Sequence, residues 1–319
     1  MNRKTAPDIK DAIEFNLQLK PYQHFTLANA VPVYTVDAGA QDVLQVELVF
    51  YAGNWFEKQN SVASATNSLL KNGTSNKTAF QLNEEFEYYG AYLSRACYNE
   101  TSVVSLSTLS KQLPKLLPVV REMITDSVFS DEELNIYKQN SRQRLSVSLK
   151  KSDFVANRLS DAYLYGQDHP YGKYSNTEDI DALESSLLKT HFNEYYLNGQ
   201  CVIFVSGKLP GDIEQQLNNA FGDLALKAYN NTLTDISQLP ASEKRFRIQN
   251  DADGVQGSIR IARPFFNRHH PDFMKVMVLN TLFGGFFGSR LMSNIREDKG
   301  LQGFYSGLHH QQYESGKRS

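Results

Sequence analysis

Cysteine and long apolar runs are scarce in this chain of 319 residues, and each shortage excludes a class of protein. Two cysteines, Cys97 and Cys201, are too few for a disulfide scaffold, so we expect reduced thiols in a reducing compartment. No run of about 20 apolar residues occurs, which predicts no membrane span. Residues 1–22 carry charges and no apolar stretch, so we expect no secretory signal and a cytoplasmic location.

An excess of charge of either sign is also missing. The chain has 33 Lys and Arg residues against 35 Asp and Glu residues, a formal net charge of -2. That balance predicts neither a nucleic-acid-binding surface nor a polybasic membrane anchor. Hydrophobic residues make up 41% of the chain, which is enough to bury a sizeable core.

Strand-like and helix-like segments occur in blocks, a pattern typical of the α+β class. Alternation of apolar and polar residues predicts strands over residues 43–51, 91–98, 101–107, 200–206 and 255–262. Helical spacing of apolar residues predicts helices over residues 61–71, 78–88, 113–126, 131–148, 154–165, 187–196, 212–221 and 272–282. Thr78 and Ser130 are the predicted N-caps of two of these helices, the second with Glu133 at the capping-box position.

A polar segment divides the chain into two predicted domains. The predicted divisions are an N-terminal extension over residues 1–21, a first domain over 22–224, a linker over 225–246 and an incomplete second domain over 247–319. The short second domain would leave a sheet edge that calls for cover from a partner. A truncated chain or a frameshift is therefore an open alternative.

The segment Ser61–Thr74, SVASATNSLLKNGT, belongs to a series of short motifs in a fixed order. Together the motifs resemble the pitrilysin/insulinase family of zinc metallopeptidases, and its mitochondrial processing peptidase branch in particular. The matching fragments are Phe25–Asn29, Gly53 with Glu57, Gly73-Thr74, Glu85–Leu93, Asp126–Leu134, His169–Gly172, Pro271-Asp272, Leu279-Asn280, Gly284–Leu291 and Ile295–Gly300.

The resemblance implies two similar halves, each a mainly antiparallel sheet with helices packed on it, with the second half apparently truncated. It also implies that substrate binds between the halves as an extended strand added to a sheet edge. In relatives that work as hetero-oligomers, one subunit carries zinc and its partner does not.

The residues that bind zinc in this family are replaced in this chain. The family motif has two histidines four residues apart on one helix with a glutamate between them as general base. Those positions are Ser64, Asn67 and Ser68 here, and the third ligand, expected about 76 residues further on, falls on Arg144. Neutral hydroxyls are poor zinc ligands and an amide cannot accept a proton as a carboxylate does. We therefore expect no catalytic residue, no metal and no cofactor at this site.

The second half supplies the candidate substrate-binding residues, again from the resemblance. Gly284 and Gly285 match a flexible glycine-rich segment that contacts substrate in the non-catalytic subunit of the processing peptidase, although a tight turn between helices explains them equally well. Arg296 matches an arginine that helps to hold substrate. Gly303 stands where a tyrosine is expected, and Tyr305 could replace that tyrosine only if the loop shifts.

These features predict a catalytically inactive subunit that binds unfolded peptide and completes the chamber of a zinc-bearing partner of the same family. One alternative is a stand-alone structural or assembly protein on the same scaffold. A second is an active metalloendopeptidase that uses unrecognised residues.

Overall fold

The computed structural model describes residues 18–230, 246–254, 257–262 and 269–300. By contacts the chain divides into two compact units: Met1–Lys138 with Ala182–Tyr229, and Gln139–Asp181 with Asn230–Ser319. The division between the units after Lys138 falls within helix α4, Asp131–Leu149. In the described part of the chain, no helix is both long and apolar enough to cross a membrane.

The first unit is built on a six-stranded sheet in the order β1-β2-β6-β3-β5-β4. All neighbouring pairs are antiparallel except β2 with β6, which are parallel. The strands are β1 (Gln23–Thr26), β2 (Pro32–Asp37), β3 (Val43–Phe50), β4 (Tyr92–Cys97), β5 (Ser102–Leu109) and β6 (Cys201–Gly207). The α+β class with a mainly antiparallel sheet is thus confirmed.

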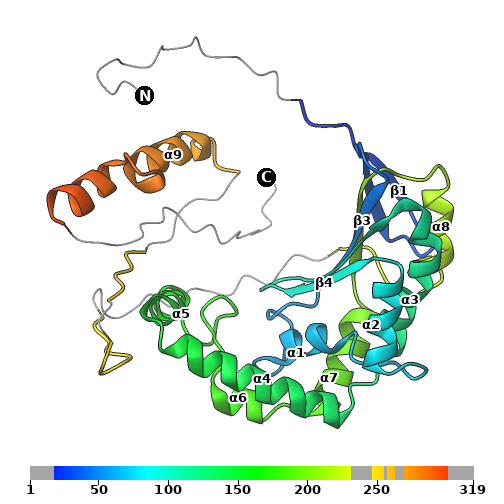
Figure 1. The fold of residues 1–319 in the computed structure, drawn as a ribbon, viewed down its shortest axis with the longest axis horizontal. Helices are drawn as coiled ribbons and strands as arrows, with labels where there is room; N and C mark the ends of the chain where they lie inside the picture. The colour runs from blue at the N-terminus through cyan, green and yellow to red at the C-terminus, as the bar shows by residue number, and fades with distance from the viewer. Residues whose placement is uncertain (1–17, 231–245, 255–256, 263–268, 301–319) are drawn as a thin grey trace. The chain divides into compact units, whose positions relative to one another are not determined.

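Helices cover one face of this sheet and form the core with it. They are α1 (Val62–Leu69), α2 (Ala79–Tyr88), η1 (Ser110–Gln112), α3 (Leu113–Asp126), α7 (Ser185–Phe192), the π-helix η2 (Asn193–Leu197) and α8 (Ile213–Phe221). Figure 1 shows α2, α3 and α8 along one side of the sheet. The predicted helix at residues 187–196 therefore exists as two parts, α7 and η2.

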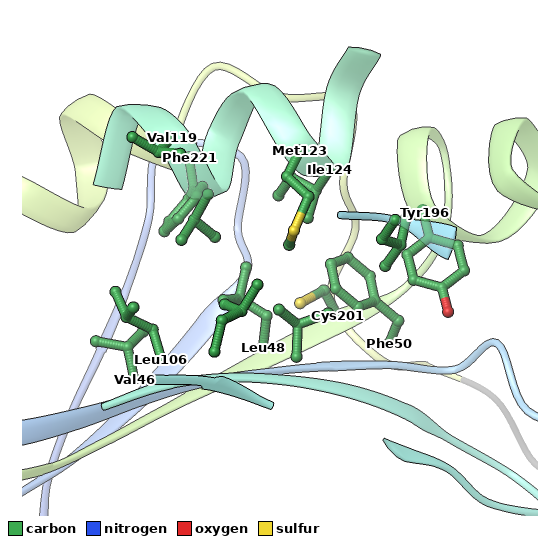
Figure 2. Packing of buried hydrophobic residues seen from close by; sticks show 14 of the residues in the cluster. Val46, Leu48, Phe50, Leu106, Val119, Met123, Ile124, Tyr196, Cys201 and Phe221 are labelled. Atoms are coloured by element: carbon green, nitrogen blue, oxygen red, sulfur yellow. The ribbon is translucent and has the colours of Figure 1, made fainter. Parts of the chain in front are cut away.

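Alternation along β3 shows why the sheet is buried on one side only. Leu44, Val46, Leu48 and Phe50 are buried, and the residues between them are partly exposed. Figure 2 shows Val46, Leu48 and Phe50 on the side of the sheet that faces Met123 and Ile124 of α3. Successive strand residues point to opposite faces, so one face of β3 is committed to the core.

Two predicted helix caps are present in the first unit. The Thr78 hydroxyl accepts from the Gln81 backbone N–H, and the Gln81 side chain accepts from the Thr78 backbone N–H. At the start of α4, the Ser130 hydroxyl accepts from the Glu133 N–H at 3.3 Å. Both caps satisfy backbone donors that a helix start leaves without a partner.

The second unit contains most of α4, α5 (Ser152–Tyr165), α6 (Thr177–Asp181), α9 (Phe273–Asn280) and the π-helices η3 (Thr281–Gly285) and η4 (Met292–Asp298). Residues 257–262 form no strand, so the strand predicted over residues 255–262 is wrong for its described part. Ile259 and Ile261 are almost fully exposed there, because no neighbouring strand pairs with them among the described residues. The predicted linker and domain bounds stay predictions.

Candidate functional site

Helix α1 holds three of the four positions where the family motif would place zinc chemistry. The helix begins after Ser61, whose backbone is left-handed with φ of 73°. The Glu57 carboxylate accepts from the Ala63 N–H at 3.0 Å and so supplies the acceptor and the negative charge that a helix N-terminus favours. Glu57 thus stabilises the start of α1.

Ser64 and Ser68 share one side of α1, as their spacing predicts, whereas Asn67 lies on the buried side. Ser64 and Ser68 are partly exposed, whereas the residues between them are buried. The Ser64 hydroxyl donates to the Ser61 carbonyl at 3.1 Å, a bond within the helix start. The two serines therefore lie on the exposed side of α1, and the Asn67 side chain points into the core.

Asn67 is held in a buried polar cluster under the helix. Its side-chain amide donates to the hydroxyl of Tyr196, in η2, at 3.1 Å, and Ser102 bonds to the same hydroxyl. Figure 2 shows Tyr196 beside Phe50, and their ring centroids are 4.8 Å apart. Burial raises the pKa of the Tyr196 hydroxyl. A neutral amide bonded to a neutral phenol cannot act as a general base.

A second buried polar group, His191 in α7, lies close to Tyr196. Its Nε2 atom is 3.1 Å from the Ala52 carbonyl oxygen, which also accepts from the Ser102 hydroxyl at 3.0 Å. Burial lowers the pKa of His191 to about 4, so the ring is neutral at pH 7 and donates its Nε2–H to that carbonyl. His191 thus joins the turn at Ala52 to α7.

Arg95, on β4, is the residue at this site that our sequence reasoning missed. It pairs across the sheet with Val104, a core residue, so its side chain lies on the helix-covered face. Its guanidinium donates through Nη1 to the Ser68 carbonyl near the C-terminal end of α1, where a positive charge is favourable. The sequence does contain a signal for Arg95. Leu93, Arg95 and Cys97 lie on the same side of the predicted strand, and Arg95 is the charged residue among these three.

The side chains at these positions do not fit a zinc ion. A hydrolytic zinc site needs three His, Cys or carboxylate donors and an open position for water. Ser64, Asn67 and Ser68 offer two hydroxyls and an amide, and the cationic Arg95 is bonded to the same helix. Across the described residues, no cluster of three or more His, Cys, Asp or Glu could hold a metal.

Arg144, the fourth position, lies on the part of α4 that belongs to the second unit. Its side chain is exposed, and Nη2 donates to the Ser141 hydroxyl at 3.3 Å. A guanidinium repels a divalent cation, whatever its neighbours.

The candidate substrate-binding residues lie in the second unit. Gly284 and Gly285 end the π-helix η3, and a Cβ at Gly284 would meet the Leu291 side chain at 3.1 Å. The Arg296 guanidinium lies 4.8 Å from the ring centroid of Phe287. Tyr305 falls outside the described residues. The substrate-binding role of all four stays a prediction.

Comparison with known proteins decides the family. The model of the insulinase family (peptidase family M16) matches residues 33–170, and that of the peptidase M16 inactive domain matches residues 183–317. The chain belongs to the M16 peptidase family. The family resemblance predicted from the motifs is therefore confirmed.

Curated M16 relatives are distant and longer than this chain. An uncharacterized zinc protease of Bacillus subtilis, YmxG, is 22% identical over 258 residues, covering 80% of this chain and 61% of the relative. The mitochondrial-processing peptidase subunit beta of Bos taurus is 23% identical, covering 81% of this chain and 53% of the relative. The chain thus spans somewhat more than half the length of these relatives.

Solved structures share the M16 fold. A peptidase M16 inactive domain from Pseudomonas fluorescens superposes with a TM-score of 0.69 at 24% identity, covering 87% of this chain and 68% of that chain. A protease from Helicobacter pylori gives 0.70 at 17% identity, with 88% and 69% covered. Pitrilysin gives 0.59 at 15% identity, with 74% of this chain and 26% of that chain covered.

Proposed function

We propose that this chain is a catalytically inactive M16 subunit that binds extended, unfolded peptide and completes the chamber of a zinc-bearing partner of the same family. The observation that carries the proposal is Asn67. It occupies the position of the general base, yet it is a buried amide bonded to Tyr196. Such a residue serves the packing of α1 and has no role in activating water.

Peptide binding is supported by the free edge of the sheet. Strand β4 pairs with β5 on one side, and no described strand pairs with its other side. An extended peptide gains main-chain hydrogen bonds by adding to such an edge. The Arg95–Ser68 bond holds β4 beside α1, so a peptide on this edge would pass the degenerate centre.

Partnership with a zinc-bearing subunit is supported by the relatives. One of them is named as subunit beta of the mitochondrial-processing peptidase, and others are named zinc proteases. A chain whose residues at the family's zinc positions cannot bind zinc needs such a partner to take part in proteolysis. The partner would supply the metal, and this chain would hold the peptide.

The test begins with the chain purified alone. We expect zinc far below one ion per chain by elemental analysis and no chelator-sensitive cleavage of a quenched peptide. We also expect saturable binding of an unfolded peptide by calorimetry, weakened by Leu93→Pro in β4 and unaffected by His24→Pro in β1, the opposite edge strand. The register of each strand directs these two backbone N–H groups away from the neighbouring strand, so neither proline removes a hydrogen bond of the sheet. Circular dichroism checks that both variants fold.

Two results would overturn the proposal. Stoichiometric zinc with chelator-sensitive cleavage would mean that other residues form a working centre. Binding that is equally weakened by the two proline variants, or no binding at all, would mean that β4 does not receive peptide.

A further inference from the structure

Arg95 carries a charge that the described residues do not neutralise. Its Nη1 donates to the neutral Ser68 carbonyl, and its Nε–H is buried without a hydrogen-bond acceptor. No carboxylate forms an ion pair with it in the part of the chain that the structure describes. Burying a guanidinium costs free energy that is recovered only when a partner accepts its hydrogen bonds.

Lys71 follows the end of α1, shortly after Ser68, whose carbonyl accepts from Arg95, and so brings a second cation to this region. Burial lowers the pKa of Lys71, and the charge of Arg95 lowers it further, whereas Glu87 acts in the opposite direction. Burial also lowers the pKa of Arg95, whose guanidinium nevertheless stays charged at any physiological pH. The end of α1 and the middle of β4 therefore share an excess of positive charge.

The position of this charge suggests what would neutralise it. Arg95 is in the middle of the edge strand, where an added peptide would lie within reach of side chains from β4. A guanidinium with an unused N–H is suited to a carboxylate, whose oxygens accept charge-assisted hydrogen bonds. Neutral groups of a peptide could fill the same space without neutralising the charge.

We propose that Arg95, with Lys71 beside it, is a carboxylate-binding subsite on β4 and selects peptides that carry an Asp or Glu side chain or a free C-terminal carboxylate. This inference rests on the proposed binding of peptide to β4. It adds the substrate class: acidic extended peptides are preferred over neutral ones.

The experiment uses the full chain and three otherwise uncharged peptides compared by calorimetry. The first has one central Glu and an amidated C-terminus, the second has Gln in its place, and the third is the Gln peptide with a free C-terminal carboxylate. We expect at least one carboxylate peptide to bind about tenfold more tightly than the amidated Gln peptide, as one charged hydrogen bond contributes. The two carboxylate peptides separate a side-chain from a C-terminal source.

The variants assign the preference to Arg95. Arg95→Gln is expected to remove the difference between the carboxylate and Gln peptides while the Gln peptide still binds. Arg95→Lys should keep part of the difference, because the charge remains. The matched control is Arg142→Gln, which removes an exposed arginine that pairs with Asp181, and it should leave the preference intact.

A second readout does not depend on peptide binding. The Nε–H of Arg95 gives a ¹⁵N–¹H resonance, identified by its loss in Arg95→Lys, that should move when sodium acetate replaces sodium chloride at constant ionic strength. Equal binding of all peptides by the wild type, with no acetate shift, would overturn the subsite and leave the proposed function standing. Failure of every peptide to bind overturns the proposed function instead, and a missing acetate shift then overturns the subsite as well.

Discussion

The core of the first unit and helix α9 of the second unit contain similar apolar residues, but these are buried in the first unit and partly or fully exposed on α9. In the first unit, Leu48 and Phe50 are fully buried and belong to one continuous cluster. In the second unit, α9 buries none of its residues, and Leu279 is 64% exposed. Figure 2 shows the first case, where side chains from a sheet and a helix meet.

Apolar composition does not by itself make a core. A helix with apolar residues gains stability only where a second layer covers them. The first unit has both layers, a sheet and a set of helices. The described residues of the second unit include no strand that could form such a layer around α9.

Truncation of a leucine should reduce stability strongly in the core of the first unit and hardly at all on α9. Leu48→Ala should destabilise the chain by about 3 kcal/mol, because it leaves a cavity in a packed core. Leu279→Ala, the same change on α9, should change stability by less than about 0.5 kcal/mol. Urea unfolding followed by circular dichroism measures both. Equal losses would show that α9 is covered in solution.

The pH dependence of stability tests the role of His191, a buried polar residue of the first unit. The pKa of His191 is lowered from 6.5 to about 4, so its contribution to stability is complete above pH 6.5 and is lost as the pH falls toward 4. The loss is on the order of 3 kcal/mol. In His191→Gln, whose side chain can still donate to the Ala52 carbonyl, the free energy of unfolding should depend less steeply on pH over this range.

The control for that experiment is the exposed histidine His24, replaced in the same way. His24→Gln should retain the pH dependence of the wild type. If His191→Gln also retains it, the imidazole of His191 is not held neutral by burial.

The hydrogen bond between Asn67 and Tyr196 under α1 should make a smaller contribution to stability. Asn67→Ala and Tyr196→Phe each break the buried hydrogen bond and should each cost about 1–2 kcal/mol. Because both remove one shared bond, the double variant should cost less than the sum of the two, by on the order of 1 kcal/mol. Urea unfolding of the four proteins gives this coupling. Strict additivity would mean that the bond contributes nothing.

Local features of the fold and site could be predicted from the sequence. The four-residue spacing of Ser64 and Ser68 predicted a shared face of one helix, and Thr78 is an N-cap as predicted, in a capping box with Gln81 that was not predicted. Such features depend on residues within one or two turns of each other. The alternating isoleucines of residues 257–262 misled us, since a strand forms only beside a partner.

Long-range contacts could not be predicted. Asn67 and Tyr196 are 129 residues apart, and nothing in either local sequence reports the other. Arg95 meets Ser68 only because β4 is the edge strand next to α1. These pairings depend on the order of strands in the sheet, which the periodicity of single segments does not contain.

The parallel pairing of β2 and β6 has a consequence for how the protein is made. Val33 and Leu48, from the first strands synthesised, both pair with Ile203 of β6. At ordinary rates of synthesis the ribosome needs on the order of ten seconds to go from the first of these strands to the last. During that interval β6, the strand that lies between β2 and β3 in the sheet, has not yet been synthesised. The nascent chain therefore carries two open strand edges, and a chaperone that binds extended segments would act at this stage.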